Sequence, residues 1–212
     1  MPSVTVRGSA LAAVTPDRAE LSLALTHLAP DAASALDEIS SRSQRLEQIL
    51  LSLGFSSDDW ATDGVQIAEE YQWQKESNVL MGHRATTALT VTVRSAELVS
   101  TIIRDGVTTA GASVRSLAWR VDADNPARTA LLGAAARDAR VRATAYVEAL
   151  DLQLGDVELV SEAPIAAEPS PQPRMAMAAK MSDGGAELSL NGGRVELSAE
   201  VYVRFAINVN GA

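Results

Sequence analysis

The longest alternation of apolar and polar residues in this chain lies near its C-terminal end. Residues 195–207 read VELSAEVYVRFAI, and every second residue of the run is apolar or small. A period of two is the pattern of a half-buried β-strand, in which successive side chains point to opposite faces of a sheet. A strand needs a hydrogen-bonded neighbour, so this run has to pair with strands formed much earlier. We expect it to lie in the main sheet despite its distance in sequence.

The segment just before this run, residues 164–193, has a different composition. It contains four prolines between positions 164 and 173, then glycine pairs at 184–185 and 192–193. Such a composition buries too little apolar area to offset the entropy lost on ordering, so we expect a flexible excursion. The chain of 212 residues is long enough to bury a real core. We expect a single domain over residues 1–212 that carries this excursion before its last strand.

Shorter runs predict the other strands. Residues 4–14 and 19–26 are expected to pair as a hairpin across the turn at 15–17. Residues 61–94 contain two long stretches that alternate or are β-branched, around a short polar loop, and they predict a second hairpin that protrudes from the sheet. The remaining predicted strands cover residues 114–121 and 157–160.

Three segments carry helix signals. Asp31 is placed to cap a helix that stops at Gly54, which suits a left-handed C-terminal position. A second helix begins at Ser95 and ends near Gly111. The third begins at Asn125-Pro126, runs to about residue 150 and is expected to face the sheet with Leu132, Ala135, Ala139, Ala143, Tyr146 and Leu150.

These elements predict an α+β fold. We expect a mixed, largely antiparallel sheet. The two long helices, which begin at Asp31 and Asn125, should pack on one face of it, and the hairpin of residues 61–94 should protrude.

Composition argues against several classes of function. The net charge is −9 and the isoelectric point is about 4.7, so the surplus of lysine and arginine that nucleic-acid binding needs is missing. The absence of cysteine excludes disulfides, thiolate metal sites and cysteine nucleophiles. No apolar run approaches the roughly 18–20 residues of a membrane helix. A strand pattern begins directly after residue 3 and no signal peptide precedes it. The chain therefore reads as soluble and cytoplasmic, although a chain trimmed of an export signal, and hence periplasmic or secreted, would look the same.

Carboxylates and imidazoles provide only weak candidates for chemistry. Asp58, Asp59 and Asp63 are hard ligands for a cation, but they lack the spacing of a calcium loop, and a solvated turn is the favoured interpretation. His27 and His83, the only histidines, are placed at strand ends or loops. No serine lies in a nucleophile elbow. We expect no catalytic residue, no cofactor and no resident metal.

Three methionines, Met175, Met177 and Met181, lie together in the segment 164–193. Thioethers bind Cu(I), yet a metal trap would usually add cysteine or histidine. An adaptable apolar patch that docks on a neighbouring subunit is favoured over metal binding, and plain disorder is favoured over both.

Two groups of side chains are candidates for contacts with a protein partner. Arg137, Arg140 and Arg142 form a basic patch, for which a solvated helix face or ion pairs between subunits are favoured over nucleic acid, because no aromatic platform lies nearby. Tyr71 and Trp73 are two apart on one predicted strand and share a face. Burial in the core is the default for such rings, and an interface at the tip of a protruding hairpin is the sharper hypothesis.

Motifs over nearly the whole chain carry a family resemblance. They are Val6-x-Gly8, Thr15-Pro16-Asp17-x-Ala19, Leu53-Gly54, Thr62 with Tyr71, Gly82-His83-Arg84-Ala85, Thr90-Val91-Thr92-Val93, Asp138-Ala139-Arg140-x-Arg142-Ala143, Leu154-Gly155-x-Val157 and the run 195–205. On these motifs the chain resembles the SIMPL-domain family, formerly a domain of unknown function. It departs from the family at His83, where an aromatic residue is usual, and at Asp151, where a helix-ending glycine is common.

The resemblance implies an α+β fold, an envelope or secreted location in many members and ring- or barrel-like oligomers in some. It implies no established catalytic residue. The leading hypothesis is a non-enzymatic, self-assembling interaction protein with a role in stress or at the envelope, which forms a homo-oligomer and uses Tyr71 and Trp73 at an interface. The alternative is a stress protein that binds a small ligand or a metal through the methionine-containing segment or a cavity in the oligomer.

Overall fold

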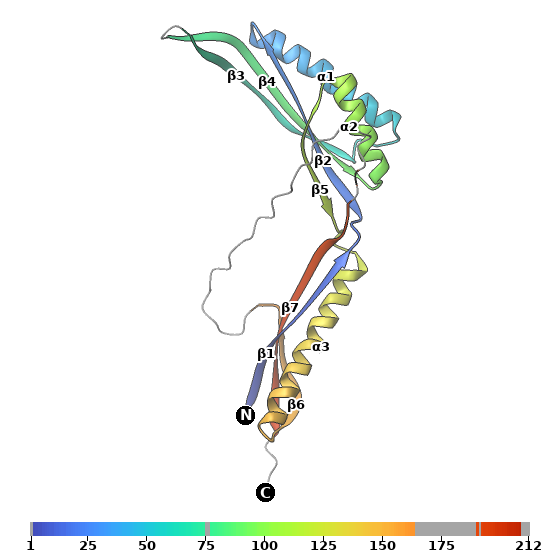
Figure 1. The fold of residues 1–212 in the computed structure, drawn as a ribbon, viewed down its shortest axis with the longest axis vertical. Coiled ribbons are helices and arrows are strands. Elements are labelled where there is room, and N and C mark those ends of the chain that lie inside the picture. The colour runs from blue at the N-terminus through green and yellow to red at the C-terminus, as the bar shows by residue number, and fades with distance from the viewer. Residues whose placement is uncertain (1, 75–76, 164–189, 191, 209–212) are drawn as a thin grey trace. The chain divides into compact units, whose positions relative to one another are not determined.

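A computed structural model describes residues 2–74, 77–163, 190 and 192–208. In this part of the chain, three helices and seven strands form two antiparallel sheets, which confirms the predicted α+β class (Figure 1). The elements follow one another as β1 (Ser3–Val14), β2 (Arg18–Ala29), α1 (Ala32–Ser52), β3 (Trp60–Gln74), β4 (Ser77–Val93), α2 (Ala96–Ala110), β5 (Ser113–Arg120), α3 (Pro126–Ala149), β6 (Gln153–Ser161) and β7 (Val195–Asn208). Most of the segment 164–193 lies outside the described residues, and so do the three methionines in it.

The chain divides into two compact units. One, the terminal unit, comprises residues 1–14, 123–186 and 194–212, and the other, the middle unit, comprises residues 15–122 and 187–193. Each sheet, with the helices that cover it, belongs to one unit.

The terminal unit is a three-stranded sheet in the order β1-β7-β6, with α3 on one face (Figure 1). The last strand is therefore central. All of β1 pairs with it, from Ser3 opposite Ala206 to Val14 opposite Val195. Its apolar residues Val201, Val203 and Phe205 pack against α3. The prediction that the final strand is built into a sheet with distant partners is confirmed.

Small residues set the distance between α3 and this sheet. Ala135, Ala139 and Ala143 are fully buried on the helix, and Gly8 faces them from β1. A Cβ atom on Gly8 would lie 2.0 Å from the carbonyl oxygen of Ala135, so only glycine fits there. The alanine stripe therefore allows α3 to approach the sheet closely.

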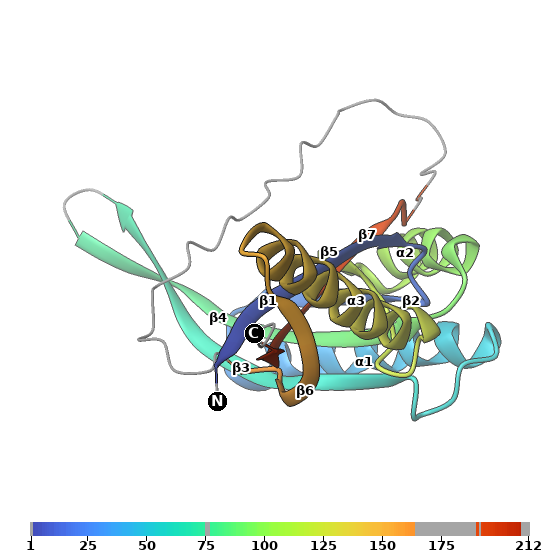
Figure 2. The ribbon, with the colours of Figure 1, turned by 90° about the horizontal axis from the view of Figure 1, so that it is seen from below.

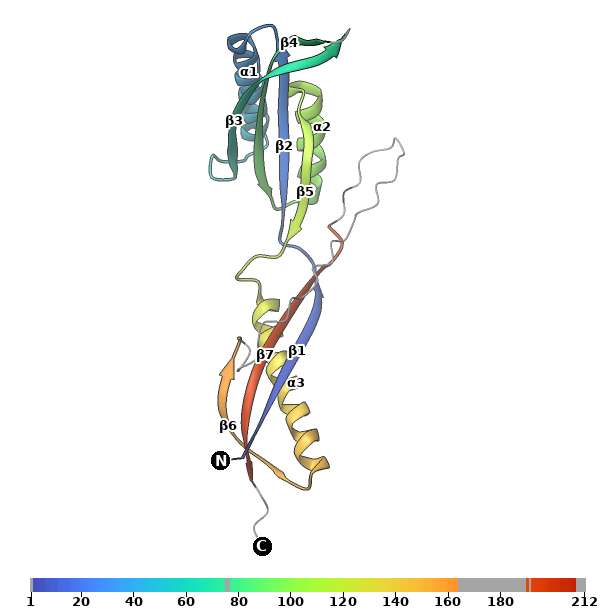
Figure 3. The same cartoon turned by 90° about the vertical axis from the view of Figure 1, so that its left-hand side faces the viewer.

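The middle unit is a four-stranded sheet in the order β3-β4-β2-β5, with α1 and α2 on the same face (Figure 3). Leu21, Leu23 and Leu25 of β2 point into the layer between sheet and helices. They meet apolar residues of the two helices, among them Ile39, Leu46, Leu50, Val99 and Ile102. Burial of these side chains is the main favourable term in the stability of the unit.

The helix boundaries agree with the capping signals. The carboxylate of Asp31 accepts a hydrogen bond from the backbone N–H of Ser34 (2.9 Å), and the Asn125 side chain accepts one from Ala127 N–H. Gly54 and Gly111 have φ of 88° and 65° just beyond their helices, the left-handed conformation expected of a C-terminal stop. None of the described helices is long and apolar enough to cross a membrane.

Two expectations about the sheets are wrong. The strands do not form one main sheet: the helix after Asp31 and the helix after Asn125 cover different sheets, and every pairing between the described strands is antiparallel. The expected hairpin of residues 4–26 does not form, because β1 pairs with β7 whereas β2 pairs with β4 and β5. Alternation determines which residues face inward, but it does not determine which strand lies alongside.

The buried stripe of α3 also differs from the prediction. Leu131 and Val147 are buried with the three alanines, while Leu132, Tyr146 and Leu150 are exposed. Apolar residues occur nearly all round this helix, so the sequence does not specify which face is buried. The fit of the alanines against Gly8 specifies the buried face.

Candidate interaction surface

The β3–β4 hairpin is longer than the sheet that carries it. Strand β2 pairs with β4 only as far as Ala29 opposite His83, whereas β3 continues to pair with β4 out to Gln74 opposite Ser77. Beyond His83 the hairpin is thus a two-stranded ribbon, and it extends away from α1 and α2 (Figures 1 and 2). This confirms the predicted protrusion.

The outer part of the hairpin carries exposed apolar residues on one face, which begin beside β2 with Val65 and Ile67 and continue onto the ribbon. On β3, Val65, Ile67, Tyr71 and Trp73 are separated by even numbers of residues and so point to the same side. Val65 lies opposite Thr87, which lies opposite the core residue Leu25, so this side is the one that the helices cover elsewhere. Leu80, the partner of Tyr71, joins the stripe from β4. We call these five residues the distal stripe.

No helix among the described residues covers the distal stripe. Its five side chains are 42–68% exposed, with Tyr71 at 53% and Trp73 at 68%. The apolar face of the sheet therefore continues past its own covering layer. Glu69 lies on the same face between Ile67 and Tyr71, so one charged side chain interrupts the apolar residues. Exposed apolar groups of this kind are candidate contact sites.

Two hydrogen-bonded groups of charged side chains lie near the stripe, one on each face of the strands. The Tyr71 hydroxyl donates a 2.6 Å hydrogen bond to Glu69, which raises the pKa of the tyrosine. Arg84 donates two 3.0 Å hydrogen bonds to Glu70, and this arginine lowers the pKa of the carboxyl. Glu69 thus shares the face of the stripe, whereas Glu70 and Arg84 lie on the opposite face.

The aromatic residues divide between core and surface. Trp60, at the start of β3, and Trp119 of β5 pack against the core of the middle unit. Tyr71 and Trp73 do not, so the default interpretation of these two rings as core residues is wrong. Their use at an interface remains a prediction. Sequence reasoning missed Val65, Ile67 and Leu80, although the same alternation that links Tyr71 to Trp73 extends back along β3.

The three acidic residues near position 60 do not converge. Asp59 accepts hydrogen bonds from the backbone N–H (2.7 Å) and hydroxyl (2.8 Å) of Ser56, which lower its pKa. Asp63 lies further along β3 and accepts a bond from Thr90. Asp58 is exposed. Within the described residues no group of three or more histidines or carboxylates is placed to hold a metal.

The two histidines lie on neighbouring strands, which the sequence did not indicate. Ala29 is opposite His83 and His27 is opposite Ala85, so the imidazoles are diagonal neighbours across β2 and β4. A nitrogen of His27 lies 3.4 Å from the Arg42 guanidinium, and His83 Nδ1 lies 3.4 Å from the Pro30 carbonyl oxygen. These contacts are structural, and no hydroxyl nucleophile is hydrogen-bonded to either ring in the described part of the chain.

The arginines of α3 do not act as one patch. Arg142 donates a 2.8 Å hydrogen bond to Asp138, so its charge is compensated. Arg137 and Arg140 lie on the outer surface of the helix around the exposed Val141.

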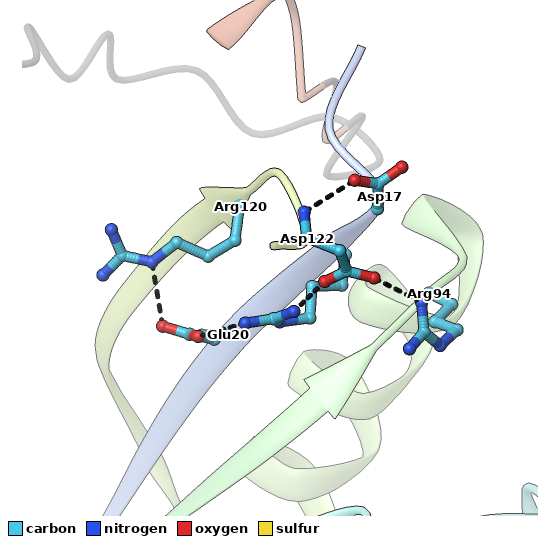
Figure 4. A network of polar contacts seen from close by, with 6 residues as sticks. Asp17, Glu20, Arg94, Arg120 and Asp122 are labelled. Atoms are coloured by element: carbon cyan, nitrogen blue, oxygen red, sulfur yellow. Dashed lines mark hydrogen bonds and ion pairs between the residues drawn. The ribbon is translucent and has the colours of Figure 1, made fainter. Parts of the chain in front are cut away.

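The densest group of charges in the middle unit lies where the chain enters and leaves it (Figure 4). Asp122 is ion-paired with Arg18 and with Arg94 (3.0 Å), and its backbone N–H donates to Asp17 (2.7 Å). Glu20 accepts a 2.9 Å bond from Arg120, and this bond is the main reason why its pKa is lowered. Every charge in the group has a partner, so we assign it to holding the ends of β2, β4 and β5 together.

The SIMPL family model, described as a protein of unknown function (DUF541), matches residues 4–205. The chain therefore belongs to the SIMPL family, as the sequence motifs predicted. No match was found among curated proteins.

Proposed function

We propose that this SIMPL protein is a non-enzymatic interaction protein that assembles with further copies of itself through the distal stripe. The observation that supports the proposal is the continuation of the core face of the sheet past α1 and α2. The stripe contains the two residue types, Tyr and Trp, that most often anchor interfaces. Among the described strands β3 is at the edge of its sheet beside the stripe, and such edges are normally covered or paired.

The free energy gained by burying Tyr71 and Trp73 can be compared with the free-energy cost of association. A tyrosine or tryptophan buries on the order of 200 Å² when fully covered, and apolar area contributes about 25 cal/mol per Å². Covering the half-exposed Tyr71 and Trp73 of two copies thus contributes roughly 10 kcal/mol. Association costs about 4–15 kcal/mol, so the stripe alone is marginal. Pairing along the edge of β3 would supply the remainder.

The net charge of −9 opposes self-association. Salt screens this repulsion, so an assembly held by the distal stripe should strengthen at higher ionic strength. An assembly held by ion pairs, for example through Arg137 and Arg140, would weaken instead.

The test is the mass of the full chain by multi-angle light scattering. We expect the unsubstituted protein to exceed the 22.3 kDa of one chain, and Tyr71→Ala with Trp73→Ala to lower the mass while the far-ultraviolet circular dichroism stays unchanged. Tyr146→Ala is the matched control, because this ring is 60% exposed on α3 of the terminal unit, whereas the stripe belongs to the middle unit. A monomeric unsubstituted protein, or a double variant of unchanged mass, would contradict the proposal.

The absence of catalysis is part of the proposal. It is supported by the structural contacts of His27 and His83. If His27→Ala with His83→Ala abolished a cellular phenotype while assembly and thermal stability stayed the same, the non-enzymatic assignment would be overturned.

A further inference from the structure

The face of the four-stranded sheet opposite α1 and α2 carries a shallow groove. Its floor is Ala24 of β2 and Ala88 of β4, which lie directly opposite each other. Both point away from the helices, because their neighbours Leu23 and Leu89 point into the core. The groove has a volume of about 200 Å³ and is lined also by Asp63, Gly64, Gln66, Thr86, Thr87 and Arg115.

Two β-bulges place charged residues on opposite sides of this floor. The β3–β4 register shifts between Thr62 and Val65, so Asp63 and Gly64 of β3 together lie opposite the single residue Ala88 of β4. Gly64 has φ of 81°, the left-handed conformation that many bulges require. The β2–β5 register shifts between Ser22 and Leu23, and Arg115 is the extra residue on β5. A bulge redirects a side chain, and here the two bulges direct an acid and a base into one groove.

The two charges line the same groove without pairing. Asp63 accepts a 3.2 Å hydrogen bond from the Thr90 hydroxyl, and no cation of the described chain pairs with it. The Arg115 side chain makes no ion pair or hydrogen bond within the described residues. Three strand spacings of about 4.8 Å separate β3 from β5, so the Cα atoms of Asp63 and Arg115 lie roughly 14 Å apart. Ala24 and Ala88 form the floor between the two charged groups, and Ala88 is 5% exposed.

We propose that this groove binds a small zwitterion of the size of an amino acid. Its ammonium group would pair with Asp63, its carboxylate would pair with Arg115, and a small apolar side chain would lie on Ala24 and Ala88. A simple anion would meet the Asp63 charge, and a simple cation would meet Arg115, so only a ligand with both charges satisfies the groove. The volume lies below the usual range of about 300–1,000 Å³ for pockets that take drug-sized ligands, and this limits the ligand to a small molecule.

The proposal is independent of self-assembly, and its test uses the full chain and the Tyr71→Ala, Trp73→Ala variant in parallel. L-alanine is the probe for isothermal titration calorimetry, with acetate and ethylamine as ligands that carry only one of the two charges. We expect saturable heat with L-alanine in both proteins and little with acetate or ethylamine. A response to acetate alone that equals the response to L-alanine would show an anion site and overturn the proposal.

Matched variants locate the site. Asp63→Asn and Arg115→Gln each remove one charge with little change of shape, and each should weaken L-alanine binding about tenfold or more. Asp58→Asn and Arg104→Gln remove the same charges from exposed positions that do not line the groove, and they should leave the affinity unchanged. The proposal fails if L-alanine gives no saturable heat, or if the Asp63 and Arg115 variants bind as well as the controls.

Discussion

Two glycines of the terminal unit, Gly8 and Gly133, have different roles. Gly8 lies against the backbone of α3, where a Cβ atom would be 2.5 Å from Ala139 N as well as 2.0 Å from Ala135 O. Gly133 lies on α3 itself, and the nearest atom to its Cβ position is the end of the Arg137 side chain at 3.5 Å. The first glycine is required by packing, and the second only costs helix stability.

We therefore expect opposite effects from the same substitution. Gly8→Ala should lower the free energy of unfolding of the terminal unit by about 3 kcal/mol or more, because backbone atoms cannot move aside as a flexible side chain does. Gly133→Ala should raise it by up to about 1 kcal/mol, the usual helix-propensity difference. Urea unfolding of both variants measures the two values. Equal effects would show that β1 and α3 are not packed as described.

Asp151 shows how a residue can depart from a family pattern without changing the backbone. It stands where a helix-ending glycine is common, and its φ of 58° is the left-handed value that glycine usually supplies. Aspartate tolerates this conformation better than most residues. The sequence indicated the position, and the structure shows that the turn is kept.

At the scale of the elements, Asp138 joins α3 to β1. Its carboxylate accepts a 2.9 Å hydrogen bond from the backbone N–H of Ser9 and a 2.8 Å bond from Arg142. The Ser9 bond, with a further contribution from Arg142, lowers the pKa of Asp138 below its ordinary value of 3.8. The sequence does not indicate this contact, because Ser9 is 129 residues away.

This contact predicts a dependence on pH. Since the pKa in the folded state lies below that in the unfolded state, the ionised carboxylate stabilises the fold above about pH 4, and this contribution is lost as the pH falls through the lowered value. Asp138→Asn should destabilise the terminal unit at pH 7 and make its stability less sensitive to pH below about pH 4. Urea titrations at several pH values test this expectation, with the exposed Asp58→Asn as control. Parallel pH curves for Asp138→Asn and the unsubstituted protein would contradict it.

At the scale of the whole molecule, the two units have separate apolar cores. One core contains Phe205, Val203 and the alanines of α3, the other contains the leucines of β2, and they share no residue. The terminal unit draws β1 and β7 from opposite ends of the chain. Its formation closes a long loop, which slows folding more than it lowers stability.

Substitutions in each core should therefore act locally. Phe205→Ala is expected to cost the terminal unit about 3–5 kcal/mol, and Leu23→Ala is expected to cost the middle unit about 2–5 kcal/mol. Hydrogen exchange followed by mass spectrometry separates the two. Phe205→Ala should speed exchange in β1, β6 and β7 but leave β2 protected, and Leu23→Ala should do the reverse. Equal loss of protection in both units from either variant would show one cooperative core.

The helices, the strands and the fold class follow from local features of the sequence. Period-two runs, caps such as Asp31 and Asn125, and left-handed glycines are local features, and local sterics and hydrogen bonds are enough to produce them. The motifs likewise determined the SIMPL family, and the length of the 61–94 strands determined that the hairpin would protrude.

Only the tertiary structure decided which strands are neighbours and which surfaces are left open. The alternation in residues 4–14 would be satisfied equally well beside β2 or beside β7. The packing of Gly8 against α3 selects β7 as the neighbour. The residues of the distal stripe alternate along the strand like those of a core strand. They are exposed because α1 and α2 do not extend over this part of the hairpin. Asp63 and Arg115 are 52 positions apart in the printed sequence. They line one groove because two bulges, on strands brought together by the sheet order, redirect them to the same place.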